Sequence, residues 1–128
     1  MDNKEKEAKE TNALVLAFLG DAVYGLKVKE FLVKENKIKA GELNRKATEF
    51  VRASAQAKVF DKVKDRLSDD EQNVASRAKN VHTSNVPKNS NLEEYKKATS
   101  LEAVVGFNYL CGNEKRINEI LEKARESK

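Results

Sequence analysis

The sequence contains few of the residues that interrupt or cross-link a chain. Its 128 residues include one Cys, one Pro, five Gly and no Trp. A lone cysteine, Cys111, excludes an intramolecular disulfide and is typical of a reducing compartment, so we expect a cytoplasmic protein. The scarcity of Pro and Gly disfavours a sheet protein with many turns and favours an all-α fold.

Long apolar runs are absent too, and we therefore expect no membrane-spanning helix. Residues 1–10 are charged and unlike a signal peptide, and we expect them to form a charged N-terminal tail that is frayed or extends the first helix. The remaining residues, 11–128, have the length of one domain. The net charge is +4, which by itself is only a weak indication of an anionic partner.

Apolar residues at helical spacing predict six helices. The first is apolar around most of its circumference, which is typical of a buried central helix. Ser68 and Glu71 form a capping-box pattern before the fourth helix, and Gly112 is a natural residue to follow the end of the fifth. A loop with Pro87 separates these two helices. The predicted helices span 12–35, 41–51, 53–67, 69–79, 92–110 and 114–125.

Two of these helices carry a lone acid in an apolar stretch: Asp21 and Glu102. A buried carboxylate is costly unless it is paired or binds a metal. Each acid has a glycine one turn later, Gly25 or Gly106, where another backbone or a ligand can approach. We interpret the chain as two crossing helices whose acids hold Mg²⁺, a cation that prefers oxygen ligands. The alternative is that each acid is satisfied by hydrogen bonds within a buried network.

The segment 77–89 is dense in hydrogen-bond donors that suit phosphate and sugar oxygens. The alternative for each residue taken singly is a solvated polar loop. We regard His82 as a surface residue or one that supports the site indirectly, because no Cys or His accompanies it at zinc-ligand spacing. The candidate residues for binding such phosphate and sugar oxygens are Arg77, Lys79, Asn80, Lys88 and Asn89.

The stretch 16–24, Leu-Ala-Phe-Leu-Gly-Asp-Ala-Val-Tyr, resembles the signature of the ribonuclease III catalytic domain. The second half of the chain is more specific. Lys79-Asn80, Val-Pro-Lys-Asn at 86–89, Tyr95 and Ala-Thr-Ser-Leu-Glu-Ala-Val-Val-Gly at 98–106 resemble Mini-ribonuclease III, as does Ala-Ser-Ala-Gln-Ala at 53–57. That branch is short and bacterial, and it has no separate double-stranded-RNA-binding domain.

The resemblance implies an all-helical, homodimeric, metal-dependent endonuclease that cuts double-stranded RNA and matures the large-subunit ribosomal RNA precursor. A ribosomal protein is a candidate helper. Asp21 and Glu102 stand where the family's metal-binding acids stand. Thr99 and Ala17 stand where larger members have two further acids, so this chain has fewer metal ligands, and Thr99 is expected to support the metal indirectly.

Two other functions remain open from the residues. One is a non-catalytic helical RNA-binding or ribosome-assembly protein that uses the same basic segment without turnover. The other is a structural helical dimer in which both acids are satisfied core groups. Removal of Asp21 or Glu102 discriminates among the three, because it abolishes cutting in an enzyme, changes little in a binding module and lowers stability in a structural dimer.

Overall fold

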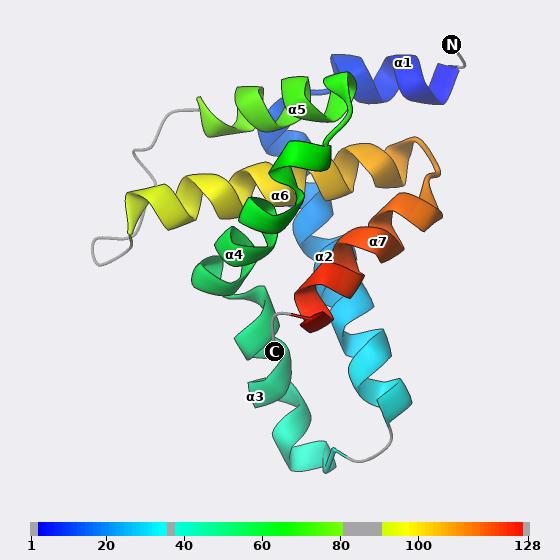
Figure 1. The fold of residues 1–128 in the computed structure, drawn as a ribbon. Coiled ribbons are helices and arrows are strands. Elements are labelled where there is room, and N and C mark those ends of the chain that lie inside the picture. Colours follow the sequence, from blue (N-terminus) through cyan, green and yellow to red (C-terminus); the bar gives the residue numbers. More distant parts are fainter. Residues whose placement is uncertain (1–2, 36–37, 81–90, 127–128) are drawn as a thin grey trace.

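The protein is described by a computed structural model over residues 3–35, 38–80 and 91–126 (Figure 1). Within these ranges it is all-α, with seven α-helices, one short 3₁₀ turn and no strand, which confirms the predicted fold class. The elements are α1 (Asn3–Glu10), α2 (Ala13–Glu35), α3 (Ala40–Val51), α4 (Ala53–Val63), η1 (Lys64–Arg66), α5 (Asp69–Lys79), α6 (Leu92–Leu110) and α7 (Glu114–Glu126).

The ends of α5 and α6 show how local sequence sets the helix boundaries. The Ser68 hydroxyl accepts from the Glu71 backbone N–H at 3.1 Å, and the Glu71 carboxylate accepts from the Ser68 N–H at 2.9 Å. This is the predicted capping box. At the end of α6, Gly112 has a φ of +76° and its N–H donates to the Tyr109 carbonyl. The N–H of Asn113 donates to the Asn108 carbonyl, which completes a Schellman ending.

Two segments differ from the sequence prediction. The third predicted helix ends at Val63 rather than Leu67, because η1 tightens the last turn before the chain becomes extended at Leu67. Residues 3–10 were expected to be frayed or to extend the first helix, but they form a separate helix, α1, which is bent by 112° relative to α2. Ala8 of α1 is fully buried, so this helix packs on the body of the molecule.

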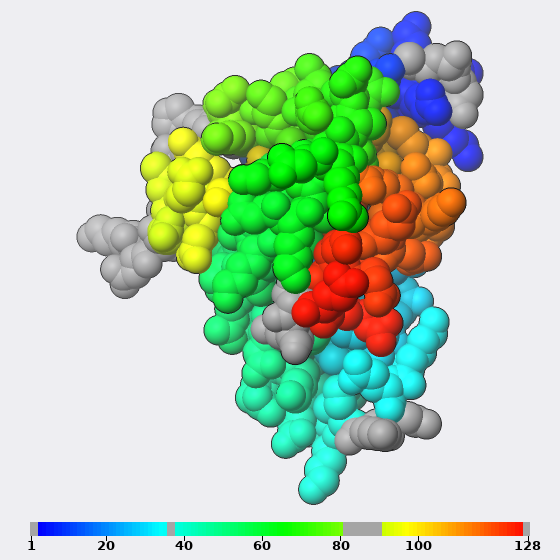
Figure 2. Space-filling view, in the orientation of Figure 1, coloured from blue at the N-terminus to red at the C-terminus, as the bar shows by residue number. Residues whose placement is uncertain are grey.

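The centre of the molecule is the crossing of α2 and α6 (Figure 1). Around it, α4 and α5 pack against α6, and α3 runs back beside the second half of α2. Figure 2 shows that α4, α5 and α7 form a continuous layer over one face, with α6 emerging at its two sides. The two helices that carry the predicted acids are therefore also the two that organise the core.

One face of α2 is exposed, so the predicted buried central helix is central to the fold but is not buried around its whole circumference. Phe18 is 82% exposed, and its apolar neighbours on the same side of the helix are also open to solvent. The exposed large apolar residues of α2 are Leu14, Val15, Phe18, Leu26 and Val33. No single helix of the described ranges is long and apolar enough to span a membrane; only α1 and α2 taken together across their bend would be.

Candidate active site

The main chains of α2 and α6 touch where the helices cross. A Cβ atom added at Gly20 would lie 1.7 Å from the Glu102 carbonyl oxygen, and one at Gly106 would lie 2.0 Å from the Leu16 carbonyl oxygen. Both glycines are therefore required by close approach of two backbones. The sequence predicted close approach at Gly25 and Gly106. The structure confirms Gly106, but in α2 the glycine at the contact is Gly20, because a Cβ at Gly25 would meet nothing within 4 Å.

This crossing brings Asp21 and Glu102 together. Asp21 follows Gly20 directly and is exposed, whereas Glu102 is half-buried. Burial raises the pKa of Glu102 to about 8, and the hydrogen bond and negative charge of Asp21 contribute to the rise. The argument from the cost of burial therefore applies to Glu102 and not to Asp21. The pair is a concentration of negative charge that a cation would relieve.

Two neutral polar side chains also converge on Glu102. Gln56 of α4 is 2% exposed, and its amide lowers the pKa of Glu102, although its Nε2 has no partner at full hydrogen-bond geometry. Tyr24 of α2 is fully buried, and its hydroxyl has no hydrogen-bond partner among the residues that the structure describes. Burial and the nearby Glu102 charge raise the pKa of Tyr24, which keeps the phenol protonated.

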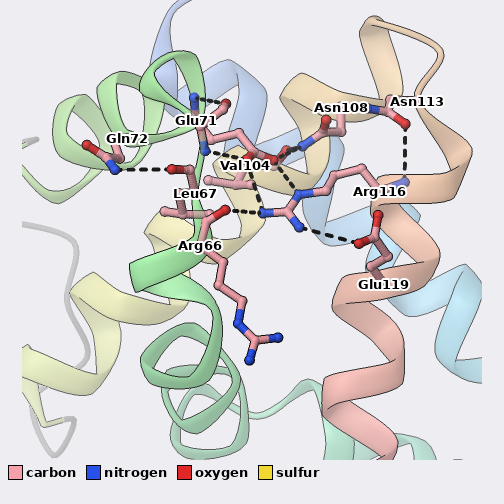
Figure 3. Close-up of polar contacts among 10 residues, drawn as sticks. Arg66, Leu67, Glu71, Gln72, Val104, Asn108, Asn113, Arg116 and Glu119 are labelled. Atoms are coloured by element: carbon pink, nitrogen blue, oxygen red, sulfur yellow. Dashed lines mark hydrogen bonds and ion pairs between the residues drawn. The ribbon is translucent and has the colours of Figure 1, made fainter.

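A second buried acid, Glu71, shows what a satisfied carboxylate looks like in the same fold (Figure 3). Arg116 donates to both of its oxygens, at 2.9 and 3.1 Å, and the Asn108 amide donates at 2.8 Å. Burial raises the pKa of Glu71, but hydrogen bonds from Arg116, Ser68 and Asn108 outweigh it and leave that pKa below its usual value. Glu71 thus ties α5, α6 and α7 together as a structural group.

The contrast between Glu71 and Glu102 favours the functional interpretation of Glu102. The fold supplies an arginine, an amide and a backbone N–H to Glu71. It places a second carboxylate beside Glu102 instead. A purely structural role does not explain why two carboxylates lie side by side, whereas a site that binds a cation does.

The residues at the crossing fit a hard divalent ion. Asp21 and Glu102 offer carboxylate oxygens, and the unpartnered donors of Gln56 and Tyr24 can hold a carboxylate or a metal-bound water in place. In the described ranges, no three His, Cys, Asp or Glu side chains gather closely enough to hold a metal. A cation here would therefore keep several waters or take oxygens from a substrate, as Mg²⁺ does readily.

Thr99 lies on α6 one turn before Glu102 and is 7% exposed. Its hydroxyl donates to the Tyr95 carbonyl at 2.9 Å, so its proton is used within its own helix. The hydroxyl oxygen still has acceptor capacity for a metal-bound water. A supporting part in metal binding stays a prediction.

The predicted RNA-binding residues fall into three groups. Lys79 and Asn80, at the end of α5, are exposed. Arg77 instead donates to the backbone carbonyls of Lys9 and Thr11, and so it fastens the junction of α1 and α2 to α5. The others, Lys88 and Asn89, lie outside the described residues, as does His82. Whether any of these residues contacts RNA stays a prediction.

Sequence reasoning missed Gln56 and Tyr24 as members of this cluster. Tyr24 looked like an ordinary core residue, and its exposure agrees with that. Gln56 carried a usable signal, because it is a polar residue on the inward face of α4, whose other buried residues are Ala57, Val59 and Val63. A buried glutamine at an apolar position indicates a polar neighbour on another element.

Comparisons with known proteins agree with this arrangement. Residues 14–113 match the family model described as "Ribonuclease III domain". The chain is 40% identical over 114 residues to "Mini-ribonuclease 3" of Brevibacillus brevis, which covers 89% of this chain and 85% of that protein. It is 36% identical over 113 residues to "Mini-ribonuclease 3" of Symbiobacterium thermophilum, covering 88% and 87% of the two chains.

A solved structure is similar over nearly its whole length. The crystal structure of a protein from Fusobacterium nucleatum superposes with a TM-score of 0.84 at 30% sequence identity. The similarity covers 92% of this chain and 94% of that one. The arrangement of helices around the crossing is therefore similar in a second protein.

Proposed function

This chain belongs to the ribonuclease III family and is an endoribonuclease of its Mini-ribonuclease III branch, and we propose that it cuts double-stranded RNA with Mg²⁺ held by Asp21 and Glu102. The family acts on double-stranded RNA. The observation that supports the metal role is the acid pair at the crossing, in which Glu102 faces Asp21 and, among the described residues, has no cationic partner such as Glu71 has.

The two acids differ in exposure, and we therefore assign them different roles. Asp21 is exposed and can approach a phosphodiester from solvent, while Glu102 is half-buried and fixed to α6. When bound, Mg²⁺ supplies an acidic water and stabilises charge on phosphoryl oxygens. The contact between Gly20 and the Glu102 carbonyl holds the two side chains at a set separation. Tyr24 stays neutral and can donate to an oxygen beside Glu102.

We assign duplex binding to the end of α5 and the segment that follows it. Lys79 and Asn80 are exposed there, and Lys88 and Asn89 belong to the same proposal. Arg77 contributes mainly by fixing α5 against the α1–α2 junction. An A-form duplex would be recognised by its shape and its 2′-hydroxyls more than by base sequence. Binding should weaken steeply with salt as counterions are released.

We also propose a homodimer formed through the exposed face of α2. An apolar patch of this kind on a small protein usually marks an interaction surface. Phe18, at 82% exposed, is its most prominent residue and lies one turn before Asp21 on the same helix. A second copy seated on this face would bring two acid pairs into one assembly.

The natural substrate that we propose is the precursor of large-subunit ribosomal RNA, cut in the cytoplasm. This assignment rests on the branch of the family and on the single cysteine of the chain. A ribosomal protein bound to the precursor is the candidate helper.

The experiment is cleavage of a labelled RNA duplex by the full chain with Mg²⁺. Glu102→Gln and a chelator provide the two controls, and Asp21→Asn is the second variant. We expect cutting to disappear in all three cases while duplex binding and the helical circular-dichroism signal persist. Binding without cutting by the unchanged protein would instead indicate an RNA-binding protein. Cutting that survives the chelator would refute the metal role.

A further inference from the structure

Gln56 is a polar residue buried in the contact between α4 and α6. It is 2% exposed on the face of α4 that packs across α6. Within the described ranges, its Nε2 is buried without a partner at full hydrogen-bond geometry. An unsatisfied buried donor is destabilising, and an apolar residue of the same size would remove that penalty. A buried donor that the fold leaves unpaired requires an explanation, and a role in a site is one such explanation.

The group that Gln56 faces is the Glu102 carboxylate. Glu102 interacts with two polar side chains from different helices. Asp21 from α2 presents a negative charge that repels the ionised form, whereas Gln56 from α4 presents an amide that favours it. Of the described groups that act on Glu102, Gln56 is the one that stabilises its charge. Three helices therefore meet at this carboxylate.

We propose that Gln56 is a positioning residue, whose amide holds the Glu102 carboxylate at the α2–α6 crossing so that Glu102 and Asp21 present their oxygens to one metal ion. The proposal rests on the metal role proposed above for these two acids. An amide suits the task because it donates a hydrogen bond without a positive charge. A lysine or arginine there would pair with Glu102 as Arg116 pairs with Glu71, and would compete with the metal.

Stability and metal affinity measured together separate positioning from a structural role. Gln56→Met keeps nearly the same size and removes the amide. If Gln56 were only a structural residue, the variant would have a lower melting temperature in chelator, and its folded state would bind Mn²⁺ with unchanged affinity. If Gln56 positions Glu102, the folded variant should bind Mn²⁺ more weakly, whatever its melting temperature.

Metal binding is the second measurement, and it needs no catalysis. Free Mn²⁺ is followed by electron paramagnetic resonance during titration of the full chain without RNA. We expect Gln56→Met to weaken Mn²⁺ binding by about 10–100-fold, the usual effect of removing a group that orients a metal ligand. The Mg²⁺ concentration for half-maximal cleavage should rise by a similar factor, and duplex binding in chelator should stay within about twofold.

Val59→Ala is the matched control, because Val59 is a buried residue of the same helix, at 2% exposure. It should lower the melting temperature and leave Mn²⁺ affinity unchanged. The proposal is overturned if Gln56→Met binds Mn²⁺ normally, or if Val59→Ala weakens binding equally. If Glu102→Gln loses Mn²⁺ while Gln56→Met keeps it, only the proposal for Gln56 fails. If Glu102→Gln binds Mn²⁺ normally, the metal role fails and this proposal falls with it.

Discussion

Gly20→Ala is the most direct test of the contact on which the site depends. The added Cβ would lie 1.7 Å from the Glu102 carbonyl oxygen and 2.9 Å from the Gly106 nitrogen, and both of these are backbone atoms. A carbon and a carbonyl oxygen in contact stay about 3.3 Å apart. The two helices must therefore separate by roughly 1.5 Å, because no flexible side chain is available to move aside.

The expected loss of stability follows from this displacement. Overpacking typically costs about 1–3 kcal/mol, and a clash with main chain belongs at the upper end of that range. The better helix propensity of alanine offsets up to about 1 kcal/mol of this loss. We therefore expect a net loss of about 2 kcal/mol in the free energy of unfolding. A displacement of about 1 Å at a catalytic group can also slow the reaction on the order of 100-fold.

Gly25→Ala is the matched control in the same helix, because a Cβ at Gly25 meets nothing within 4 Å. It should stabilise the protein by up to about 1 kcal/mol. Urea unfolding gives both free energies from midpoints at equal slope, and duplex cleavage gives the rates. If Gly20→Ala were as stable and as active as Gly25→Ala, the inference that the two backbones touch would be refuted.

Two further predictions concern the charged groups. Arg116→Met removes the main partner of Glu71, where the arginine side chain is 18% exposed, and should lower the free energy of unfolding by about 3 kcal/mol. Arg45→Met breaks an exposed ion pair and should lower it by less than about 1 kcal/mol in the same urea experiment. Equal losses in the two variants would contradict the structural role of Glu71. Because burial and Asp21 raise the pKa of Glu102 to about 8 from 4.5, the folded state binds a proton that the unfolded state has released between these values. In chelator, the melting temperature of the unchanged protein should therefore fall relative to that of Glu102→Gln as the pH rises from 4.5 to 8. Melting temperatures that change in parallel with pH would contradict the raised pKa of Glu102. Added Mg²⁺ should reduce the difference between the two proteins.

Helix boundaries could be predicted from the sequence wherever local hydrogen bonding sets them. The Ser68–Glu71 capping box starts α5, and Gly112 with its positive φ ends α6, as predicted. Each of these signals lies within a few residues of the boundary it controls. The end of α4 was wrong by four residues, because the turn through η1 is a response to packing and leaves no local mark.

The candidate site could likewise be predicted only in part. The lone acids in apolar helices predicted that α2 and α6 cross, and the structure confirms the crossing. Metal binding by Asp21 and Glu102 stays a prediction. The choice of Gly20 over Gly25 could not be predicted, because both lie within a turn of Asp21 and only the crossing angle decides between them. Gln56 reaches the site from a third helix, so no spacing within α2 or α6 indicated it.

Tyr24 can serve as an intrinsic fluorescent probe of the candidate site. The chain has three tyrosines and no tryptophan, so tyrosine emission is not lost by energy transfer to an indole. Tyr24 is fully buried beside Glu102, while Tyr109 is 48% exposed. The charge of Glu102 acts on the Tyr24 phenol, so a change in that charge alters the electric field at the ring and its emission. Any ligand that engages Glu102 should therefore change the emission of Tyr24, and occupancy can be followed in unlabelled protein.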